Sequence, residues 1–215
     1  YYGVGEKDKV AVHSENRPEW IIADIGIQAI KSITVGLYPT NPSPEVKYLL
    51  GHSESKVLFA EDQEQVDKVL EVIEHLPNLS KIVYFESRGI TKYDNEKLIS
   101  WNEFIELGKE EYEKFLLTGE EDFHWVRPKD EWQAISLSYT SGTTGNPKGV
   151  VYHHRGSYLM SMGSVSAWNM PNRLTYLYTV PMFHCNGWGY PWTLAMLHAR
   201  VVFIRNIVVK DIFNL

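Results

Sequence analysis

The stretch Tyr139-Thr140-Ser141-Gly142-Thr143-Thr144-Gly145-Asn146-Pro147-Lys148-Gly149 combines hydroxyl side chains, glycines and one lysine. It directly follows the apolar run 134–139, which predicts a buried strand. Glycines let the backbone turn sharply and come close to a ligand, and successive backbone N–H groups in such a turn form a concave anion site. The hydroxyls add hydrogen-bond donors, and Lys148 adds a mobile positive charge. The stretch therefore predicts a strand that ends in a loop for a polyphosphate.

The residues around the lysine exclude a Walker A loop. That motif needs Gly-x4-Gly-Lys-Ser/Thr, whereas Lys148 lies between Pro147 and Gly149. A solvated linker rich in serine, threonine and glycine would explain the small residues. It would not explain a Pro-Lys-Gly segment placed between two apolar, strand-like runs. We therefore interpret the stretch as a phosphate loop of a different kind.

The composition is that of a globular protein with ample material for a core, because 44% of the 215 residues are hydrophobic and 22% are charged. The net charge of -6 argues against a nucleic-acid partner, which usually requires a basic face. The single cysteine, Cys185, excludes an intrachain disulfide framework and predicts a reducing, cytoplasmic location. No apolar run approaches the roughly 20 residues of a membrane-spanning helix, which leaves peripheral membrane association open.

Strand-like and helix-like segments alternate along the chain, which predicts an α/β fold of mostly parallel, helix-covered sheets. We expect strands at 9–13, 33–38, 57–60, 82–85, 134–139, 174–180 and 201–205. We expect helices at 16–32, 43–51, 62–76, 101–117, 154–168 and 188–198. Asn16 and Ser43 are expected to begin the first two helices. Ligands of such folds bind beyond the carboxyl ends of the strands, where the loop after Tyr139 begins.

The chain resembles the adenylate-forming superfamily of acyl-CoA synthetases, aryl-CoA ligases, luciferases and peptide-synthetase adenylation domains. The resemblance is uninterrupted over residues 139–149. Residues 1 to about 105 are similar to bacterial long-chain fatty acyl-CoA synthetases, on the stretches 13–20 and 37–42. From about Tyr112 onward the chain is more similar to plant-type or bacterial acyl-activating enzymes, on the stretches 130–137, 151–156 and 181–188.

The resemblance also implies a domain organisation. Residues 1–173 would form a first α/β subdomain that includes the phosphate loop, and residues 174–215 would begin a second, truncated α/β subdomain. The C-terminal domain of the family would be absent. The chain begins at Tyr1 rather than at a methionine, and its last residues, 211–215, look like the opening of a helix. We therefore expect a piece of a longer protein.

The activity that the resemblance implies is the activation of a medium- or long-chain fatty acid. The carboxylate would attack the α-phosphorus of ATP to give an acyl-adenylate and pyrophosphate, and coenzyme A would then displace AMP. ATP, Mg²⁺ and coenzyme A are the implied cofactors and co-substrates. Two other functions stay open: a non-catalytic phosphate-binding remnant or scaffold, and an adenylation domain that serves a carrier protein.

The resemblance assigns roles to particular residues. Lys148 would neutralise the outer phosphates of ATP, and Thr144 would also lie near Mg²⁺. His184 would lie where the acyl pocket meets the adenylate phosphate, so that Lys148 and His184 are the catalytic candidates. The ATP phosphates would be held by Thr140, Ser141, Gly142, Thr143, Thr144, Gly145 and Lys148.

Several of these residues and their neighbours have a plainer interpretation. His184 lies among apolar residues and could be a hydrogen-bonded core histidine. His153 and His154 are adjacent, so they point to different faces, and no partner at ligand spacing supports a metal site there. We expect the cluster of Glu15, Arg17 and Glu19 to lie at the surface. We expect most of a tryptophan and methionine set to lie in the core, namely Trp168, Trp188, Trp192, Met160, Met162 and Met170.

Overall fold

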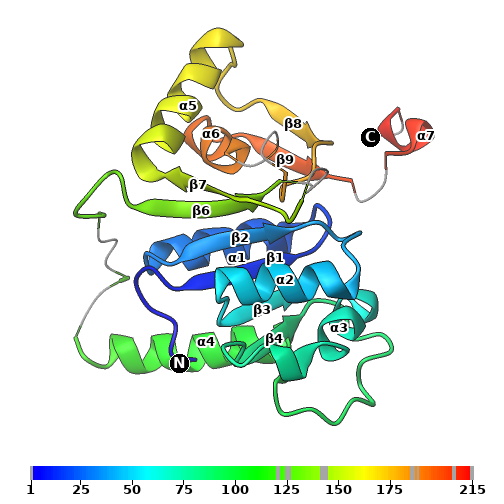
Figure 1. Cartoon of the computed structure of the whole chain (residues 1–215). Coiled ribbons are helices and arrows are strands. Elements are labelled where there is room, and N and C mark those ends of the chain that lie inside the picture. Colours follow the sequence, from blue (N-terminus) through cyan, green and yellow to red (C-terminus); the bar gives the residue numbers. More distant parts are fainter. Residues whose placement is uncertain are drawn as a thin grey trace.

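The computed structural model describes residues 2–119, 122–123, 127–140, 145–184, 187, 189–204 and 207–213. Its strands form a seven-stranded sheet of order β5-β4-β3-β1-β2-β6-β7 and a separate two-stranded sheet, β8-β9 (Figure 1). The strands are β1 (Lys9–His13), β2 (Ile33–Leu37), β3 (Val57–Ala60), β4 (Lys81–Tyr84), β5 (Leu98–Ser100), β6 (Ala134–Tyr139), β7 (Gly149–His153), β8 (Thr175–Tyr178) and β9 (Arg200–Phe203). The helices are α1 (Pro18–Ala29), α2 (Ser43–Ser53), α3 (Gln63–Leu70), the short 3₁₀ turn η1 (Ile73–His75), α4 (Trp101–Leu116), α5 (His154–Ala167), α6 (Tyr190–Met196) and α7 (Val209–Ile212).

The pairing of the strands confirms the prediction of an α/β fold with mostly parallel sheets. Strands β1 to β6 pair in parallel with their neighbours, and so do β8 and β9. Only the edge strand β7 runs antiparallel, to β6. The connection 140–148 is too short for the crossover that a parallel pair needs, so the chain turns back as a hairpin.

Both faces of the central strands β1, β2 and β3 are buried, which explains why these strands are continuous apolar runs. On one face, residues of β1, β2, β3 and β4 pack against α2 and α3. On the other face, the alternate residues of β1 and β3 pack against α1. Residues that lie far later in the sequence, including Tyr178, Met182 and Leu194, join this second cluster. The segment around the small sheet is therefore packed onto the α1 side of the large sheet.

Ser43 begins its helix as expected and Asn16 does not, and neither side chain caps its helix. Asn16 does not cap α1, because the cap position is Arg17 and no side chain bonds to the free backbone groups there. Ser43 is the first residue of α2 after Pro42, and its hydroxyl donates to the Glu71 carboxylate instead. In both cases a partner far along the chain competes with the local capping bond. Such partners leave no trace in the local sequence pattern.

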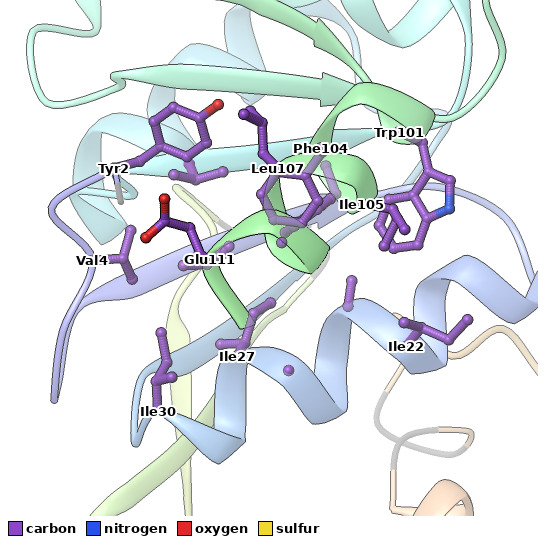
Figure 2. A pocket seen from close by; sticks show the side chains of 16 residues that line it. Tyr2, Val4, Ile22, Ile27, Ile30, Trp101, Phe104, Ile105, Leu107 and Glu111 are labelled. Atoms are coloured by element: carbon purple, nitrogen blue, oxygen red, sulfur yellow. The ribbon is translucent and has the colours of Figure 1, made fainter. Parts of the chain in front are cut away.

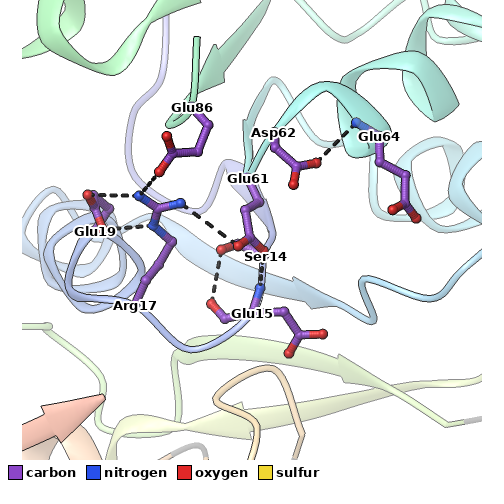
Figure 3. A network of polar contacts seen from close by, with 8 residues as sticks. All are labelled: Ser14, Glu15, Arg17, Glu19, Glu61, Asp62, Glu64 and Glu86. Atoms are coloured by element: carbon purple, nitrogen blue, oxygen red, sulfur yellow. Dashed lines mark hydrogen bonds and ion pairs between the residues drawn. The ribbon is translucent and has the colours of Figure 1, made fainter. Parts of the chain in front are cut away.

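Arg17 lies in an ionic cluster that is more buried than the sequence predicts (Figure 3). Its guanidinium lies 2.8 Å from Glu19, 3.9 Å from Glu61 and 3.0 Å from Glu86, and it stacks over the ring of Phe85 at 5.0 Å. Glu61 is only 3% exposed. The expectation of a surface cluster was wrong for Arg17, because Glu61 and Glu86 come from the ends of β3 and β4. The cluster thus ties the start of α1 to the carboxyl edge of the sheet.

The aromatic and methionine residues of the later segment are less buried than expected. Trp168 is 73% exposed, and Met160 and Met162 of α5 are 40% and 45% exposed. Trp192 and Met170 do pack against the core, while Trp188 lies outside the described residues.

No helix in the described part of the chain is both long and apolar enough to cross a membrane.

Asp24 of α1 is a fully buried carboxylate beneath the later segment. Burial raises its pKa from 3.8 to about 6, while the hydrogen bond from the Gln28 side chain lowers it. The Gln28 amide donates to Asp24 over 2.6 Å and accepts a bond from the Trp192 indole N–H at 3.0 Å. Asp24 therefore supports the contact between α1 and α6, but its ionised form is poorly solvated.

Replacing Asp24 with asparagine should remove part of the pH dependence of stability. Because the folded-state pKa lies above the ordinary value, the folded chain holds an extra proton between about pH 4 and pH 6 and loses stability as the pH rises through that range. By pH 7 the loss amounts to roughly 3 kcal/mol. Urea unfolding at about pH 4.5 and about pH 7.5 should show Asp24→Asn gaining stability relative to the unchanged protein at the higher pH. An equal difference at both pH values would contradict this.

Candidate functional site

The loop 140–148 is closed at its base by two hydrogen bonds between Thr140 and Lys148. The Thr140 N–H donates to the Lys148 carbonyl at 3.0 Å, and the Lys148 N–H donates to the Thr140 hydroxyl oxygen at 3.0 Å. The Thr140 hydroxyl thus accepts a bond that holds the loop, and its own hydrogen is left to donate. Both residues are exposed, and they lie where β6 ends at the carboxyl edge of the sheet.

The loop 140–148 is only partly described. The predicted phosphate-binding residues Ser141, Gly142, Thr143 and Thr144 lie outside the described residues. Gly145 has a φ of +152°, a backbone conformation that side-chain-bearing residues rarely adopt. The Lys148 side chain is exposed, and no carboxylate among the described residues pairs with it. Its charge is therefore available to a ligand.

Helix α2 holds the loop at both ends. The Tyr48 hydroxyl donates to the Pro147 carbonyl at 3.2 Å, near the end of the loop. The Nδ1 atom of His52 lies 2.8 Å from the Tyr139 hydroxyl, directly before the loop. Tyr48 and His52 are one helical turn apart and stack on each other at 5.4 Å. Burial raises the pKa of Tyr139 to about 12, so its hydroxyl stays protonated.

Sequence reasoning missed Tyr48 and His52 as supports of the loop. Their spacing of four residues on a predicted helix was the only available signal, since it places both side chains on one face. Nothing in the sequence indicated that this face lies against residues about 90 positions later.

His184 lies at the carboxyl end of the strand next to β6. Its ring is edge-on to the ring of Tyr38, with 6.0 Å between centroids, and Tyr38 also contacts Phe183 at 4.7 Å. Tyr38 directly follows β2, which pairs in parallel with β6. Neighbouring strands lie about 4.8 Å apart. The structure thus brings both catalytic candidates, Lys148 and His184, to adjacent strand ends.

A glycine in β2 admits the His184 segment to this position. A Cβ atom on Gly36 would lie 3.1 Å from Cα of Phe183 and 3.2 Å from its carbonyl oxygen. Such distances are shorter than ordinary van der Waals contact, so only the missing side chain lets the backbone of residue 183 lie on the strand. The His184 N–H then donates to the Pro181 carbonyl at 3.1 Å, which turns the chain back over β2.

Buried polar side chains fix the segment that carries Tyr38. The Nε2 atom of His13 lies 3.0 Å from the Tyr38 carbonyl. The Gln65 amide and the Lys68 ammonium both donate to the Pro39 carbonyl, at 3.2 Å and 2.7 Å. Burial lowers the pKa of His13 to about 4. His13 is therefore neutral at physiological pH, and Nε2 must carry its hydrogen because a carbonyl can only accept.

The histidine pair 153–154 has a structural role at His153. Its Nδ1 atom accepts a bond from the Gly156 N–H at 2.9 Å and so caps α5, while its ring packs on Trp132 at 4.6 Å. In the described ranges, no group of three or more His, Cys, Asp or Glu residues is arranged to hold a metal ion.

A parallel α/β sheet with a glycine- and hydroxyl-rich loop at its carboxyl edge is typical of proteins that bind nucleotides. The family model of AMP-binding enzymes matches residues 2–214, and the chain belongs to this family. The chain is 35% identical to a peroxisomal acetate/butyrate–CoA ligase of Arabidopsis thaliana, over 99% of this chain and 37% of that protein. It is 34% identical to a 2-methylpropanoate–CoA ligase of Humulus lupulus, again over 99% and 37%. The chain therefore spans less than two fifths of the length of these relatives.

Solved structures share the fold over nearly the whole chain. A fatty acyl-CoA synthetase of Mycobacterium tuberculosis superposes with a TM-score of 0.75 at 18% identity, covering 99% of this chain and 37% of that one. An o-succinylbenzoate–CoA synthetase of Bacillus subtilis superposes with a TM-score of 0.69 at 18% identity, covering 99% and 47%. At this identity the comparison supports the fold alone.

Replacing Gly36 with alanine should destabilise the chain by about 1–3 kcal/mol, because the new methyl group meets the backbone of residue 183. Gly26→Ala in α1 is the matched control, since a Cβ there meets nothing within 4 Å. In a helix that change should stabilise by about 0.5–1 kcal/mol. Urea unfolding of the two variants measures both effects. Equal stabilities would contradict the close approach of the His184 segment to β2.

Proposed function

We propose that the protein containing this chain joins a carboxylic acid to coenzyme A at the expense of ATP, through an acyl-adenylate. The observation that carries this proposal is the loop 140–148, which two hydrogen bonds close at its base and in which no described carboxylate pairs with Lys148. The loop follows β6, and His184 lies against Tyr38 at the end of the neighbouring strand β2. Membership of the AMP-binding family and the printed names of the relatives support the same reaction.

The first step of the proposed reaction forms a bond between a carboxylate oxygen and the α-phosphorus of ATP. The bond from that phosphorus to the bridging oxygen breaks, and pyrophosphate leaves. Negative charge grows on the phosphate oxygens in this step, so prearranged donors and cations lower the barrier. We assign Lys148 to the outer phosphates and Thr140, Ser141, Gly142, Thr143, Thr144 and Gly145 to the remaining phosphate contacts. Magnesium, bound to the phosphates near Thr144, would neutralise further charge.

In the second step the sulfur of coenzyme A attacks the acyl carbon and AMP leaves with the electron pair of the broken C–O bond. We place His184 where the acyl group meets the adenylate phosphate. The rings of Tyr38 and Phe183 beside it offer an apolar wall with a polar edge. We assign no described residue to coenzyme A itself.

The start of the chain and the relatives favour different chain lengths for the acid. The stretches near the start of the chain favour a medium- or long-chain fatty acid. The relatives named above act on acetate, butyrate and 2-methylpropanoate according to their names, which favours a short acid. Comparing straight and branched acids of about two to about sixteen carbons distinguishes a short-chain from a long-chain enzyme, because each methylene buried in the acyl pocket adds about 0.8 kcal/mol to binding.

We propose a cytoplasmic enzyme that could associate peripherally with membranes if its acid is long. The relative from Arabidopsis is named as peroxisomal, so localisation of a tagged protein decides this point.

We further propose a division into a first subdomain, residues 1–173, and the start of a second, residues 174–215. The separate sheet β8-β9 supports a boundary between them.

Exchange of labelled pyrophosphate into ATP tests the proposal, with the complete protein and each acid of the series. Exchange that depends on an acid supports adenylate formation. A complete protein without exchange for any acid would favour a non-catalytic phosphate-binding module instead. Exchange followed by acyl transfer to a carrier protein, but not to coenzyme A, would favour an adenylation domain.

Lys148→Ala should slow adenylate formation by about 10²–10³-fold, because it removes a cation from the developing charge. Thioester formation from supplied acyl-adenylate should change far less, since the outer phosphates have already left. Lys109→Ala is the matched control, because Lys109 is also exposed, at 62%, but lies on α4 and pairs with Glu106. Rapid-quench measurement of each half-reaction distinguishes the variants. Equal losses in both half-reactions would count against a phosphate role for Lys148.

A further inference from the structure

We infer that Asn16 is a positioning residue for His184, an inference that rests on the proposed function of the site. Asn16 follows β1 by three positions and is 7% exposed. Its side chain makes three hydrogen bonds, all to the backbone of the segment 178–182. That segment ends two residues before His184.

The three bonds use both halves of the Asn16 amide. Its oxygen accepts from the Met182 N–H at 2.8 Å. Its nitrogen donates to the Tyr178 carbonyl at 3.2 Å and to the Val180 carbonyl at 3.0 Å. A side chain of this length that both donates twice and accepts is found only in asparagine. The segment leaves β8 here, so Asn16 supplies the bonding that a neighbouring strand would otherwise give.

The position set by Asn16 is passed on to His184 over a short and tightly packed distance. Met182 is completely buried and Phe183 is 7% exposed. Phe183 lies on Gly36, and the His184 N–H closes a turn onto the Pro181 carbonyl. The segment from Met182, which bonds to Asn16, to His184 is therefore too tightly packed to absorb a shift. A loss of the Asn16 bonds moves the His184 ring relative to Tyr38.

This role differs from that of the other buried polar groups. The bonds of Gln28 and Trp192 also join the later segment to α1, but they act on α6, beyond the site. His13, Gln65 and Lys68 hold the other side of the contact, the Tyr38 segment. Asn16 is the described side chain whose hydrogen bonds act directly on the chain entering His184.

A double-mutant cycle in the complete protein tests the inference. We expect Asn16→Ala to slow adenylate formation by about 10- to 100-fold, since misplacement of a site group by about 1 Å has an effect of this size. In a His184→Ala background, the same change should slow it by less than about 3-fold, because the group it positions is gone. Asn95→Ala is the matched control, because Asn95 is half-buried and its side-chain oxygen accepts only from the nearby Lys97 N–H among the described residues, so this change should have no effect in either background.

The outcomes separate the two proposals. Equal losses from Asn16→Ala in both backgrounds, or no loss in either, would overturn the positioning role and leave the proposed function intact. If His184→Ala itself kept full activity, the assignment of His184 would fall instead, whatever the result at Asn16.

A second variant keeps the test informative if Asn16→Ala does not fold. Asn16→Asp retains the acceptor for the Met182 N–H. It replaces the amide NH₂ group, which donates to the Tyr178 and Val180 carbonyls, with an oxygen that faces the same two carbonyls. Burial and these carbonyls favour its protonated form, which regains a donor. The rate of Asn16→Asp relative to the unchanged protein should therefore rise as the pH falls. A ratio that stays constant over pH would contradict the role of the two carbonyl bonds.

Discussion

Residues 34–36 of β2 pair in parallel with residues 136–138 of β6, and this pairing determines where the candidate site lies. Because the two strands run in the same direction, their carboxyl ends meet at one edge of the sheet. The loop 140–148 leaves the end of β6, and Tyr38 leaves the end of β2. Gly36 lets a third segment lie across the same place and bring His184 with it. Three stretches that are distant in sequence thus converge where two neighbouring strands end.

Hydrogen bonds, rather than ion pairs, hold these stretches together. Tyr48 and His52 support the loop, and Asn16 supports the segment before His184. The Tyr38 segment is supported by His13, Gln65 and the Lys68 ammonium. Most of these bonds end on backbone carbonyls, so they fix the course of the chain rather than a particular side chain. The charged groups of the Arg17 cluster lie beside the site and anchor α1. No described carboxylate pairs with Lys148.

The sequence was sufficient for the strands with long apolar runs and insufficient for contacts made across the fold. The runs 9–13, 57–60 and 134–139 coincide with β1, β3 and β6, because burial on both faces requires continuous apolar residues. Strand β5 was missed, since its three residues are only partly buried and show no pattern. Local chemistry singled out the loop and Lys148, and their phosphate role stays a prediction. The supporting residues Asn16 and His52 were not, because their partners lie 87 or more positions away.

The unusual acidities of two supporting side chains bear on how pH–rate profiles of this protein should be read. The pKa of His13 is about 4 and that of Tyr139 about 12, so neither side chain changes its charge between roughly pH 6 and pH 10. These two supporting side chains therefore keep their charge over the interval in which most enzymes are assayed. An inflection within that interval would report on a group other than His13 or Tyr139.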